Sequence, residues 1–338
     1  MAKRFLLSGY FGFKNFGDEE ILSLLIQKLQ QAQHRITVIS SDPKFTKSQY
    51  KDIKSIYTFN FNEILSAIAK ADVIVSGGGS LLQDATSLKS LFYYLFIIFT
   101  ALIFGKKVII FAQGIGPIDN NFGEFCTRVI LKHCSYISVR DEKSYELLKS
   151  WGINAELVCD PIFSLNVQNK EEKKEVVAVQ LRDFPTMSEK FITDLSNKVC
   201  ENFSDKKIEI YSFQDSIDYD VCKKFENKLH EINPDIKTTI YSGLTNTQIT
   251  ENISKAQYLI GMRFHSIIIG LLAKCKILTI NYDIKVGKIA KEFDLPSLQL
   301  KKEITNQFET LKNEQPEKIY EKVKTKKFNW SGFINAIK

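Results

Sequence analysis

Short apolar runs alternate with helical segments along most of the chain. In the first half, Phe5–Ser8, Val73–Val75 and Val108–Ala112 are predicted strands. Between them, segments such as Glu19–Gln31 place their apolar residues at the spacing of one helix face. Strands that alternate with helices of about 10–15 residues form βαβ units, which build a mostly parallel sheet. The pattern therefore predicts an α/β protein.

The alternation is interrupted once, by the polar and charged segment 166–175 (NVQNKEEKKE), which we interpret as a linker. It restarts with the predicted strand Val176–Leu181 and continues to the predicted helix Val286–Phe293. A chain of 338 residues is also too long for one ordinary domain. We predict two doubly wound, Rossmann-like domains and a helical C-terminal extension, over residues 1–165, 176–300 and 301–338.

Composition excludes several classes of function. The net charge is +7, and the last 38 residues, with nine lysines and five glutamates, hold +4 of it, so we predict no nucleic-acid partner. The six cysteines form no CxxC pair and the four histidines form no HExxH motif, so we predict no metal site. The first seven residues lack the apolar core of a signal peptide, which predicts a cytoplasmic protein.

One apolar segment, Leu91–Phe104, resembles a membrane span but has only 14 residues, where about 17–25 are needed. It is predicted to be a core helix, with contact to a membrane surface as the alternative. The basic, aromatic tail near Trp330 has the same two interpretations: a charged helix packed back on the domains, or a peripheral contact with the inner face of the plasma membrane.

Ligands of doubly wound sheets bind beyond the carboxyl ends of the strands, so the loops that follow predicted strands hold the candidate residues. In the first half these loops are rich in glycine, which lets the backbone approach a ligand closely. Their candidate residues are Gly12, Asn15, Asp18, Gly77, Gly78, Gly79, Ser80, Gln83, Asp84 and Gln113.

Two of these positions have alternative interpretations. The GGGS run at 77–80 is expected to open a helix whose N-terminus binds a phosphate or carboxylate, or else to be a tight turn without a ligand. Asp18 either caps the helix that follows it or serves as a functional carboxylate. The first loop does not match GxGxxG, which argues against a dinucleotide.

Basic side chains follow three other predicted strands. Arg140 follows Tyr136–Val139, Arg263 and His265 follow a strand that ends near Gly261, and Lys285 follows the last strand of the second half. A guanidinium can bind phosphate or carboxylate in two places, and a histidine can transfer a proton near neutral pH. Together these residues suit a compact anion with several charges. An Asp-paired surface arginine and a structural histidine are the alternatives for Arg140 and His265.

Seven segments, in this order along the chain, resemble the polysaccharide pyruvyl transferase family, and most closely its cell-surface-anchoring branch. They are GYFGFKNFGDEEIL at 9–22, SGGGSLLQDATSLKSLFYYL at 76–95, QGIGP at 113–117, SVRDEKSYELLKSWG at 138–152, DPIF at 160–163, GMRFHSIIIGLLA at 261–273 and NYDIKV at 281–286.

The resemblance implies a fold like that of the GT-B glycosyltransferases. It also implies transfer of the pyruvyl group of phosphoenolpyruvate to a sugar diol, which forms a cyclic ketal and releases phosphate. In the anchoring branch the sugar is an N-acetylmannosamine of a lipid-linked cell-wall polymer precursor, and the ketal helps to hold S-layer proteins. Phosphoenolpyruvate is then a substrate, and no cofactor is required.

The roles that we assign on this basis are hypotheses. His265, Arg140, Lys285 and Asp18 are the catalytic candidates, with His265 as acid or as phosphate ligand. The donor would be bound by Arg140, Gly261, Arg263, His265 and Lys285, and the acceptor by the glycine-rich loops listed above.

Two alternatives stay open. A GT-B glycosyltransferase that uses a nucleotide sugar would share the fold, the glycine loops and the basic residues. An inactive homologue that only binds glycans or anions would have little use for a titrating histidine beside paired cations. The sequence does not specify the oligomeric state.

Overall fold

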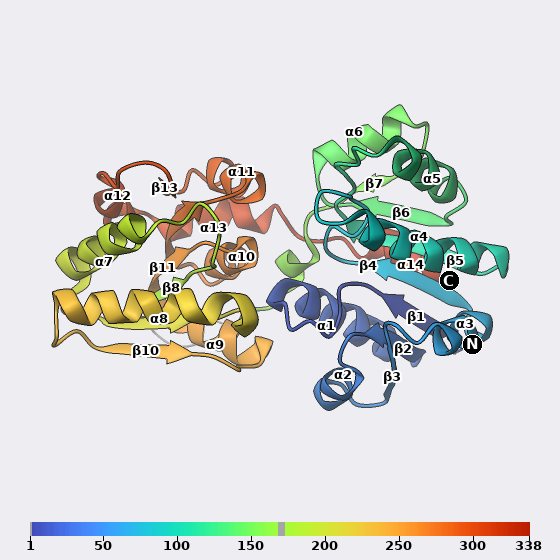
Figure 1. The fold of residues 1–338 in the computed structure, drawn as a ribbon, viewed down its shortest axis with the longest axis horizontal. Helices are drawn as coiled ribbons and strands as arrows, with labels where there is room; N and C mark the ends of the chain where they lie inside the picture. Colours follow the sequence, from blue (N-terminus) through green and yellow to red (C-terminus); the bar gives the residue numbers. More distant parts are fainter. Residues whose placement is uncertain (1, 168–172) are drawn as a thin grey trace. The chain divides into compact units, whose positions relative to one another are not determined.

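The computed structural model describes residues 2–167 and 173–338, which fall into two compact α/β units (Figure 1). Unit 1 comprises the chain up to Ile162 together with Phe328–Lys338, and unit 2 comprises Phe163–Lys327. Half of the predicted linker, residues 168–172, lies outside the described residues. The predicted class, with two Rossmann-like parallel sheets, is confirmed.

Unit 1 contains a seven-stranded parallel sheet with the strand order β3-β2-β1-β4-β5-β6-β7. Its central strands are apolar on both faces because helices cover both sides of the sheet. The strands are β1 (Arg4–Ser8), β2 (Arg35–Ser40), β3 (Ile53–Tyr57), β4 (Val73–Gly77), β5 (Lys107–Gln113), β6 (Tyr136–Val139) and β7 (Glu156–Leu157). The helices are α1 (Phe16–Gln31), α2 (Pro43–Gln49), α3 (Phe61–Lys70), α4 (Leu88–Ile103), α5 (Asn121–Leu131), α6 (Glu142–Ser150) and α14 (Ser331–Ile337).

Unit 2 contains a six-stranded parallel sheet with the strand order β10-β9-β8-β11-β12-β13. The strands are β8 (Lys174–Gln180), β9 (Lys207–Tyr211), β10 (Thr238–Tyr241), β11 (Ala256–Gly261), β12 (Lys276–Asn281) and β13 (Ser297–Gln299). The helices are α7 (Glu189–Phe203), α8 (Asp215–Ile232), α9 (Asn246–Lys255), α10 (Phe264–Leu272), α11 (Ile284–Glu292), α12 (Gln307–Asn313) and α13 (Pro316–Lys324). A short 3₁₀ helix, η1 (Pro161–Ser164), contains the last residues of the first segment of unit 1 and the first residues of unit 2.

Both sheets have a point where the strand order reverses. In unit 1 this point lies between the neighbouring strands β1 and β4, and in unit 2 it lies between β8 and β11. Loops at the carboxyl ends of such strand pairs diverge to opposite faces of the sheet and leave a crevice for ligands. The candidate site of each unit is therefore expected in the loops that follow these four strands.

The helix expected directly after the GGGS run does not form. Residues 78–87 are a loop that includes a single bridge from Leu82 to Ile115, and α4 begins only at Leu88, after its N-cap Ser87. Gly78 and Gly79 have φ angles of +74° and +68°, a backbone conformation that cannot start a right-handed helix. The run therefore forms a turn and not the N-terminus of a helix.

Helix α4 contains most of the apolar segment 91–104. One side of the helix, including Leu91, Ile98 and Ala101, is buried, which confirms the predicted core helix. The opposite side stays exposed at Phe99 and Ile103. Among residues 2–167 and 173–338, every helix is too short or too polar to cross a bilayer.

The aromatic tail packs into the core of unit 1. The rings of Phe328, Trp330 and Phe333 lie 5.5, 5.4 and 4.9 Å from that of Phe111, which is fully buried. Burial of Phe328 and Phe333 excludes them from contact with a membrane in this structure. The tail thus follows the prediction of a segment packed back on the protein.

Candidate functional site

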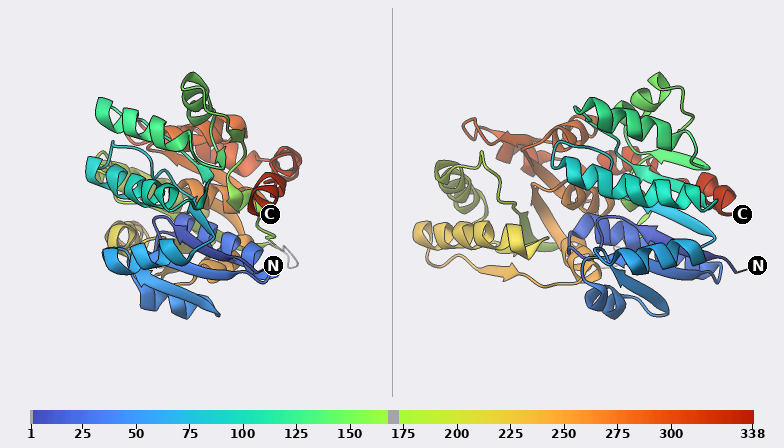
Figure 2. Two further views of the ribbon diagram at one scale, coloured as in Figure 1. Left: turned by 90° about the vertical axis from the view of Figure 1, so that its right-hand side faces the viewer. Right: turned by 45° about the vertical axis from the view of Figure 1, so that its right-hand side comes forward.

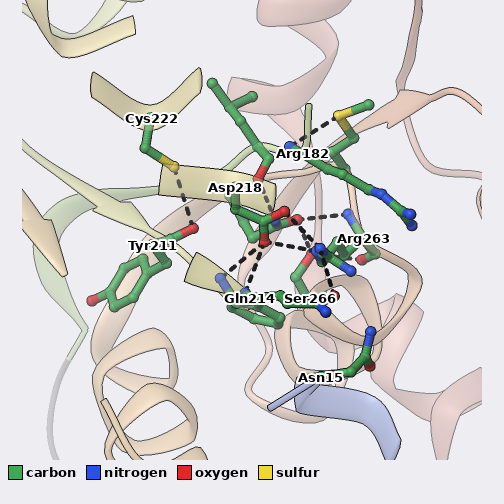
Figure 3. A network of polar contacts seen from close by, with 12 residues as sticks. Asn15, Arg182, Tyr211, Gln214, Asp218, Cys222, Arg263 and Ser266 are labelled. Atoms are coloured by element: carbon green, nitrogen blue, oxygen red, sulfur yellow. Dashed lines mark hydrogen bonds and ion pairs between the residues drawn. The ribbon is translucent and has the colours of Figure 1, made fainter. Parts of the chain in front are cut away.

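A buried ion pair lies at the carboxyl edge of the unit 2 sheet (Figure 3). Arg263 directly precedes α10, and its Nε and Nη2 atoms donate to the two carboxylate oxygens of Asp218 at 2.8 and 2.6 Å. The two side chains are only 8% and 0% exposed. Such a two-point contact between a guanidinium and a carboxylate fixes both groups in one orientation.

Several further hydrogen bonds hold this pair in place. Asp218 lies in the first turn of α8 and also accepts from the backbone N–H groups of Phe213 and Gln214. The Arg263 backbone N–H donates to the Gln180 side chain at the end of β8, at 2.6 Å. Arg263 is thus tied to β8 and α8, and two of its nitrogens are already engaged before a ligand binds.

Arg182 is a second cation at the same edge, and we did not select it from the sequence. It follows β8 by two residues, and its Nη1 atom donates to the Tyr282 hydroxyl at 3.2 Å. The guanidinium also lies over the Tyr282 ring, 5.6 Å from its centroid. Among the described residues no carboxylate pairs with Arg182, and its buried Nε atom has no hydrogen-bond partner.

Arg182 and Arg263 both influence the pKa of the Tyr282 hydroxyl. Burial is the main cause that raises the pKa of Tyr282, with a smaller contribution from Asp283, whereas Arg182 and Arg263 act in the opposite direction. Figure 3 shows the Arg182 side chain extending away from the Asp218–Arg263 pair. Because Arg182 directly follows a strand, the positional rule that selected Arg140 and Arg263 would also have found it.

The other predicted residues of unit 2 lie on two helices and at the end of one strand. His265 is the second residue of α10, its Nε2 atom is buried, and its ring meets that of Phe264 edge-on at 5.3 Å. Gly261 ends β11, and a Cβ atom there would lie 2.9 Å from the Ser266 hydroxyl. Lys285 is an exposed residue in the first turn of α11, which begins after its N-cap Asp283.

In unit 1, the loop after β1 is organised around the start of α1. The cap of α1 is Asn15, whose side chain accepts from the backbone N–H groups of Gly17 and Asp18, so the expected cap at Asp18 is wrong. The helix starts at Phe16, three residues earlier than expected. Gly12, at φ +81°, has no space for a side chain because a Cβ atom would lie 2.1 Å from the Ser40 hydroxyl.

Glu19 is a buried carboxyl group in this loop that the sequence analysis did not select. Its Oε1 atom accepts from the backbone N–H groups of Gly12 and Lys14 at 2.7 and 3.3 Å. Burial raises the pKa of Glu19 to about 8 despite these two hydrogen bonds. A buried acid at an apolar helix position carries no sequence signal that separates it from the exposed Glu residues of the chain.

The loops after β1 and β4 lie close together. A Cβ atom on Gly79 would lie 2.6 Å from the Asp18 carboxylate, so Asp18 packs directly against the glycine run. Likewise, a Cβ atom on Gly114 would lie 2.6 Å from the Ser80 hydroxyl and 3.2 Å from the Asp141 carboxylate. The structure therefore brings together Asp18 and Gly79, and separately Ser80 and Asp141.

Three other predicted residues of unit 1 have structural contacts. Asp84 accepts from the backbone N–H groups of Asp119 and Asn120, and these bonds lower its pKa. The Gln83 side chain closes a local turn with Thr86. Gln113 is fully buried and donates to Ser76. These contacts fix the loops around the glycine run.

Arg140 is paired, as one of its two interpretations supposed, but it is not on the surface. Its Nη1 atom donates to Asp160 at 2.5 Å, and the two side chains are 8% and 2% exposed. Asp160 also accepts from the backbone N–H of Ile162. The DPIF segment therefore holds the arginine that follows β6. Among the residues that the structure describes, no three Cys, His, Asp or Glu side chains cluster as metal ligands.

The architecture is similar to that of sugar-nucleotide enzymes of known structure. Anabaena Alr3699/HepE, solved with UDP and glucose, matches with a TM-score of 0.62 over 99% of this chain and 98% of its own, at 9% identity. The UDP-GlcNAc 2-epimerase of Methanocaldococcus jannaschii matches with 0.63 over 96% and 99%, at 13% identity. A putative UDP-N-acetylglucosamine 2-epimerase of Listeria monocytogenes matches with 0.65 over 100% and 94%, at 9% identity.

At these identities the likeness concerns the fold alone, and it defines a GT-B-like protein with two Rossmann-like domains. No curated protein sequence matches the chain. The family model for polysaccharide pyruvyl transferase matches residues 15–284, and the chain belongs to this family of transferases. Membership implies that a glycan is the acceptor.

Proposed function

We propose that the protein transfers the pyruvyl group of phosphoenolpyruvate to two hydroxyls of a sugar, forming a cyclic ketal and releasing phosphate. Membership of the polysaccharide pyruvyl transferase family over residues 15–284 is the observation that carries this proposal. The acceptor in the proposal is an N-acetylmannosamine of a lipid-linked cell-wall precursor, reached from the cytoplasmic face of the membrane, and the product contributes to S-layer anchoring.

The cations of unit 2 support an anionic donor. Arg182 has no carboxylate partner among the described residues, and it stands at the strand-order reversal beside the Tyr282 hydroxyl. Phosphoenolpyruvate carries a phosphate and a carboxylate attached to the same carbon, C2. Arginine binds either group with two parallel hydrogen bonds. In this proposal Arg182 is a donor ligand, together with His265, Lys285 and the backbone at Gly261.

Arg263 acts differently in this proposal. Its Nε and Nη2 atoms are engaged by Asp218, so its main task is to fix the start of α10, and with it His265. Because the Asp218 carboxylate neutralises this guanidinium, Arg263 positions the donor site and leaves the net positive charge to Arg182 and Lys285. In this proposal Arg140, which Asp160 neutralises in the same way, fixes the loop after β6 in unit 1.

The reaction needs one proton at the methylene carbon and a route for two hydroxyl protons. The His265 imidazolium gives its proton to the methylene carbon, and the C2 atom becomes oxocarbenium-like. One sugar hydroxyl adds to C2, phosphate leaves with the C2–O bond electrons, and the second hydroxyl closes the ketal. One hydroxyl proton returns to His265, and the other leaves with the phosphate.

The glycine-rich loops of unit 1 are the proposed acceptor side. Asp18 packs against Gly79, and Asn15 orders the start of α1, so these loops present backbone N–H groups and one carboxylate in a fixed geometry. Sugar hydroxyls both donate and accept hydrogen bonds, which such a mixture of groups satisfies. Gly12, Gly77, Gly78 and Ser80 shape the loops, while Gln83, Asp84 and Gln113 hold them.

The test is thermal stabilisation of the purified protein by phosphoenolpyruvate, UDP, GDP or NAD, each added separately. A ligand at 100 times its Kd adds about 2.7 kcal/mol of apparent stability, which is an easily measured shift in Tm. We expect stabilisation by phosphoenolpyruvate, reduced at least tenfold in affinity by Arg182→Met and unchanged by Arg35→Met, an exposed arginine of β2. His265→Gln keeps a hydrogen-bonding group but cannot protonate carbon, so it is expected to weaken donor binding less than Arg182→Met does and to abolish phosphate release in the presence of an acceptor glycan.

The alternative enzyme class has a different outcome. Alr3699/HepE was solved with UDP and glucose on a similar fold. Stabilisation by UDP or GDP, with none by phosphoenolpyruvate, would identify this chain as a nucleotide-sugar enzyme and overturn the proposal. If the protein binds phosphoenolpyruvate but releases no phosphate with any N-acetylmannosamine glycan, it is instead an inactive homologue that only binds anions.

A further inference from the structure

The outer side of α4 exposes an apolar stripe. Phe96, Phe99 and Ile103 follow one another at helical spacing, and their side chains are 38%, 50% and 65% exposed. No charged residue occurs from Ser90 through Gly105. A helix of a globular protein normally carries polar residues on its outer side, so this side of α4 is built for contact with something apolar.

The neighbouring helices extend the stripe into a surface. Helices α3, α4 and α5 lie side by side on one face of the unit 1 sheet (Figure 2). The rings of Phe61 and Phe96 approach to 5.9 Å, and those of Phe92 and Phe122 to 5.8 Å, which joins the three helices through aromatic contacts. We call this surface the aromatic face; its most exposed residues are Phe61, Phe96, Phe99, Ile103, Phe122 and Phe125.

The aromatic face lies in the part of the chain that has most of the exposed apolar side chains. Most of the exposed large hydrophobic side chains in the described part of the chain lie between residues 57 and 129. Single exposed apolar residues are normal, but a contiguous patch marks a binding surface. The aromatic face belongs to unit 1 alone.

Basic residues gather at one end of the aromatic face. The three helices each lead into a strand of the same parallel sheet, so their C-terminal ends lie at the same edge. Lys70 ends α3, Lys106 follows α4 and donates to the carbonyl of Ala69, and Lys132 follows α5. Arg128 and Lys89 add two more positive charges on α5 and α4, against only Glu63 and Glu124 on the three helices.

We propose that the aromatic face docks on an anionic phospholipid surface, with the phenylalanines inserted at the boundary of head groups and acyl chains and the lysines on the lipid phosphates. Interfacial elements combine exposed aromatic residues with lysine and arginine in this way. A second copy of the chain fits less well, because the face carries more basic than acidic residues, so two copies would bring mostly like charges together. The proposal does not depend on the reaction proposed above.

The test is co-sedimentation of the full-length protein with vesicles of phosphatidylcholine, alone or mixed with phosphatidylglycerol. We expect binding to the mixed vesicles that weakens as salt rises, because salt screens the attraction. Phe99→Ser with Ile103→Ser and Phe125→Ser should reduce binding at least tenfold. The matched control, Tyr219→Ser with Ile232→Ser, removes exposed apolar residues of α8 in unit 2 and should leave binding unchanged.

Two further readouts keep the test specific to this face. Phe99→Trp should show a blue shift of tryptophan emission when mixed vesicles are added, and Lys70→Gln with Lys132→Gln should weaken binding to the mixed vesicles only. All substituted residues are exposed, so circular dichroism should confirm folded variants. Absence of vesicle binding would overturn the proposal. So would a dimer in sedimentation velocity that the Phe99, Ile103 and Phe125 substitutions abolish, since the face would then join two copies.

Discussion

The Asp218 carboxylate links three parts of unit 2. It accepts from Arg263 at the start of α10 and from the backbone of Phe213 and Gln214 between β9 and α8. Removal of one partner of a buried ion pair leaves the other charge without compensation, which is far costlier than loss of an exposed pair. Substitution of Asp218 should therefore change both the stability of unit 2 and the position of Arg263 in the candidate site.

We expect Asp218→Asn to lower the free energy of unfolding by about 3 kcal/mol, because the buried Arg263 guanidinium loses its counter-charge. Asp194→Asn, which removes the exposed pair with Lys190, is the matched control and should cost less than about 1 kcal/mol. Urea unfolding measures both. Equal effects in the two variants would show that the Asp218–Arg263 pair does not stabilise unit 2.

Glu19 makes the stability of the protein depend on pH. Burial raises its pKa to about 8 in the folded protein, whereas an unfolded chain has a Glu pKa of about 4.3. Between these values the folded state binds more protons than the unfolded state, so stability falls as pH rises. Burial raises the pKa of Glu314 to about 7, which acts in the same direction.

The expected result is a decrease in the free energy of unfolding from pH 5 to pH 8, approaching about 1.4 kcal/mol per pH unit for each group that remains protonated. Glu19→Gln keeps an oxygen that accepts from Gly12 and Lys14 but cannot ionise, so its curve should be flatter over the same range. Denaturant titrations at several pH values measure the slope. An unchanged slope in Glu19→Gln would contradict the assignment.

At the scale of an element, the loop after β4 depends on close contact between glycine and Asp18. Gly79 and Gly152 have the same φ angle of +68°, but a Cβ atom would meet Asp18 at Gly79 and nothing within 4 Å at Gly152. Both alanine variants should lose about 1 kcal/mol through backbone strain. Gly79→Ala should lower the free energy of unfolding by more than Gly152→Ala does, because its Cβ atom also meets Asp18. It should also weaken acceptor binding.

A double-mutant cycle with Asp18→Ala separates these causes. If the extra cost comes from the clash with the carboxylate, Gly79→Ala should be less harmful in the Asp18→Ala background, whereas Gly152→Ala should be unaffected. Thermal unfolding of the three single and two double variants measures this. Simple additivity at position 79 would argue that strain alone accounts for the loss.

Helices and strands were predictable where the apolar pattern continued over enough residues to be recognised. Helix α1 ends at Gln31 as predicted, although it begins three residues earlier, and strand β6 (Tyr136–Val139) matches its predicted range. Strand β13 has only three residues, too few for a pattern, and α2 was not predicted although Asp42 and Pro43 form a recognisable N-terminus. The helix expected after the GGGS run does not form, because two consecutive glycines at positive φ continue the turn.

The candidate site was predictable only by position along the chain. Arg140, Arg263 and His265 were selected because they follow strands, and the structure places them there. Their partners Asp160 and Asp218 are distant in sequence and were not selected for that role. Spacing therefore identifies which cations stand at a sheet edge, but it does not show that two of them are already paired.

At the scale of the whole molecule, the two units share one chain in an interleaved order. Unit 1 is completed by Phe328–Lys338 after the chain has formed unit 2. The Lys3 ammonium donates to the carbonyl of Ile337, so the two ends of the chain meet in unit 1. Phe111 is covered by the rings of Phe328, Trp330 and Phe333.

Truncation after Lys327 is therefore expected to destabilise unit 1 selectively. Loss of a buried phenylalanine such as Phe333 alone typically costs about 3–5 kcal/mol, and truncation removes several aromatic contacts at once. Hydrogen exchange should show lost protection in β4 and β5, with protection retained in β8 and β11. Equal loss of protection in both sheets would mean that the units do not unfold independently.

The interleaved order also affects how the protein is made. A ribosome delivers Val73–Gly77 and Lys107–Gln113 early, but the rings that cover Phe111 are translated only after the whole of unit 2. Most multidomain chains can fold their first domain while the next is still being synthesised. Here the first sheet keeps an uncovered aromatic surface until residues 328–338 have been translated, so the nascent chain exposes part of the unit 1 core while unit 2 is being synthesised.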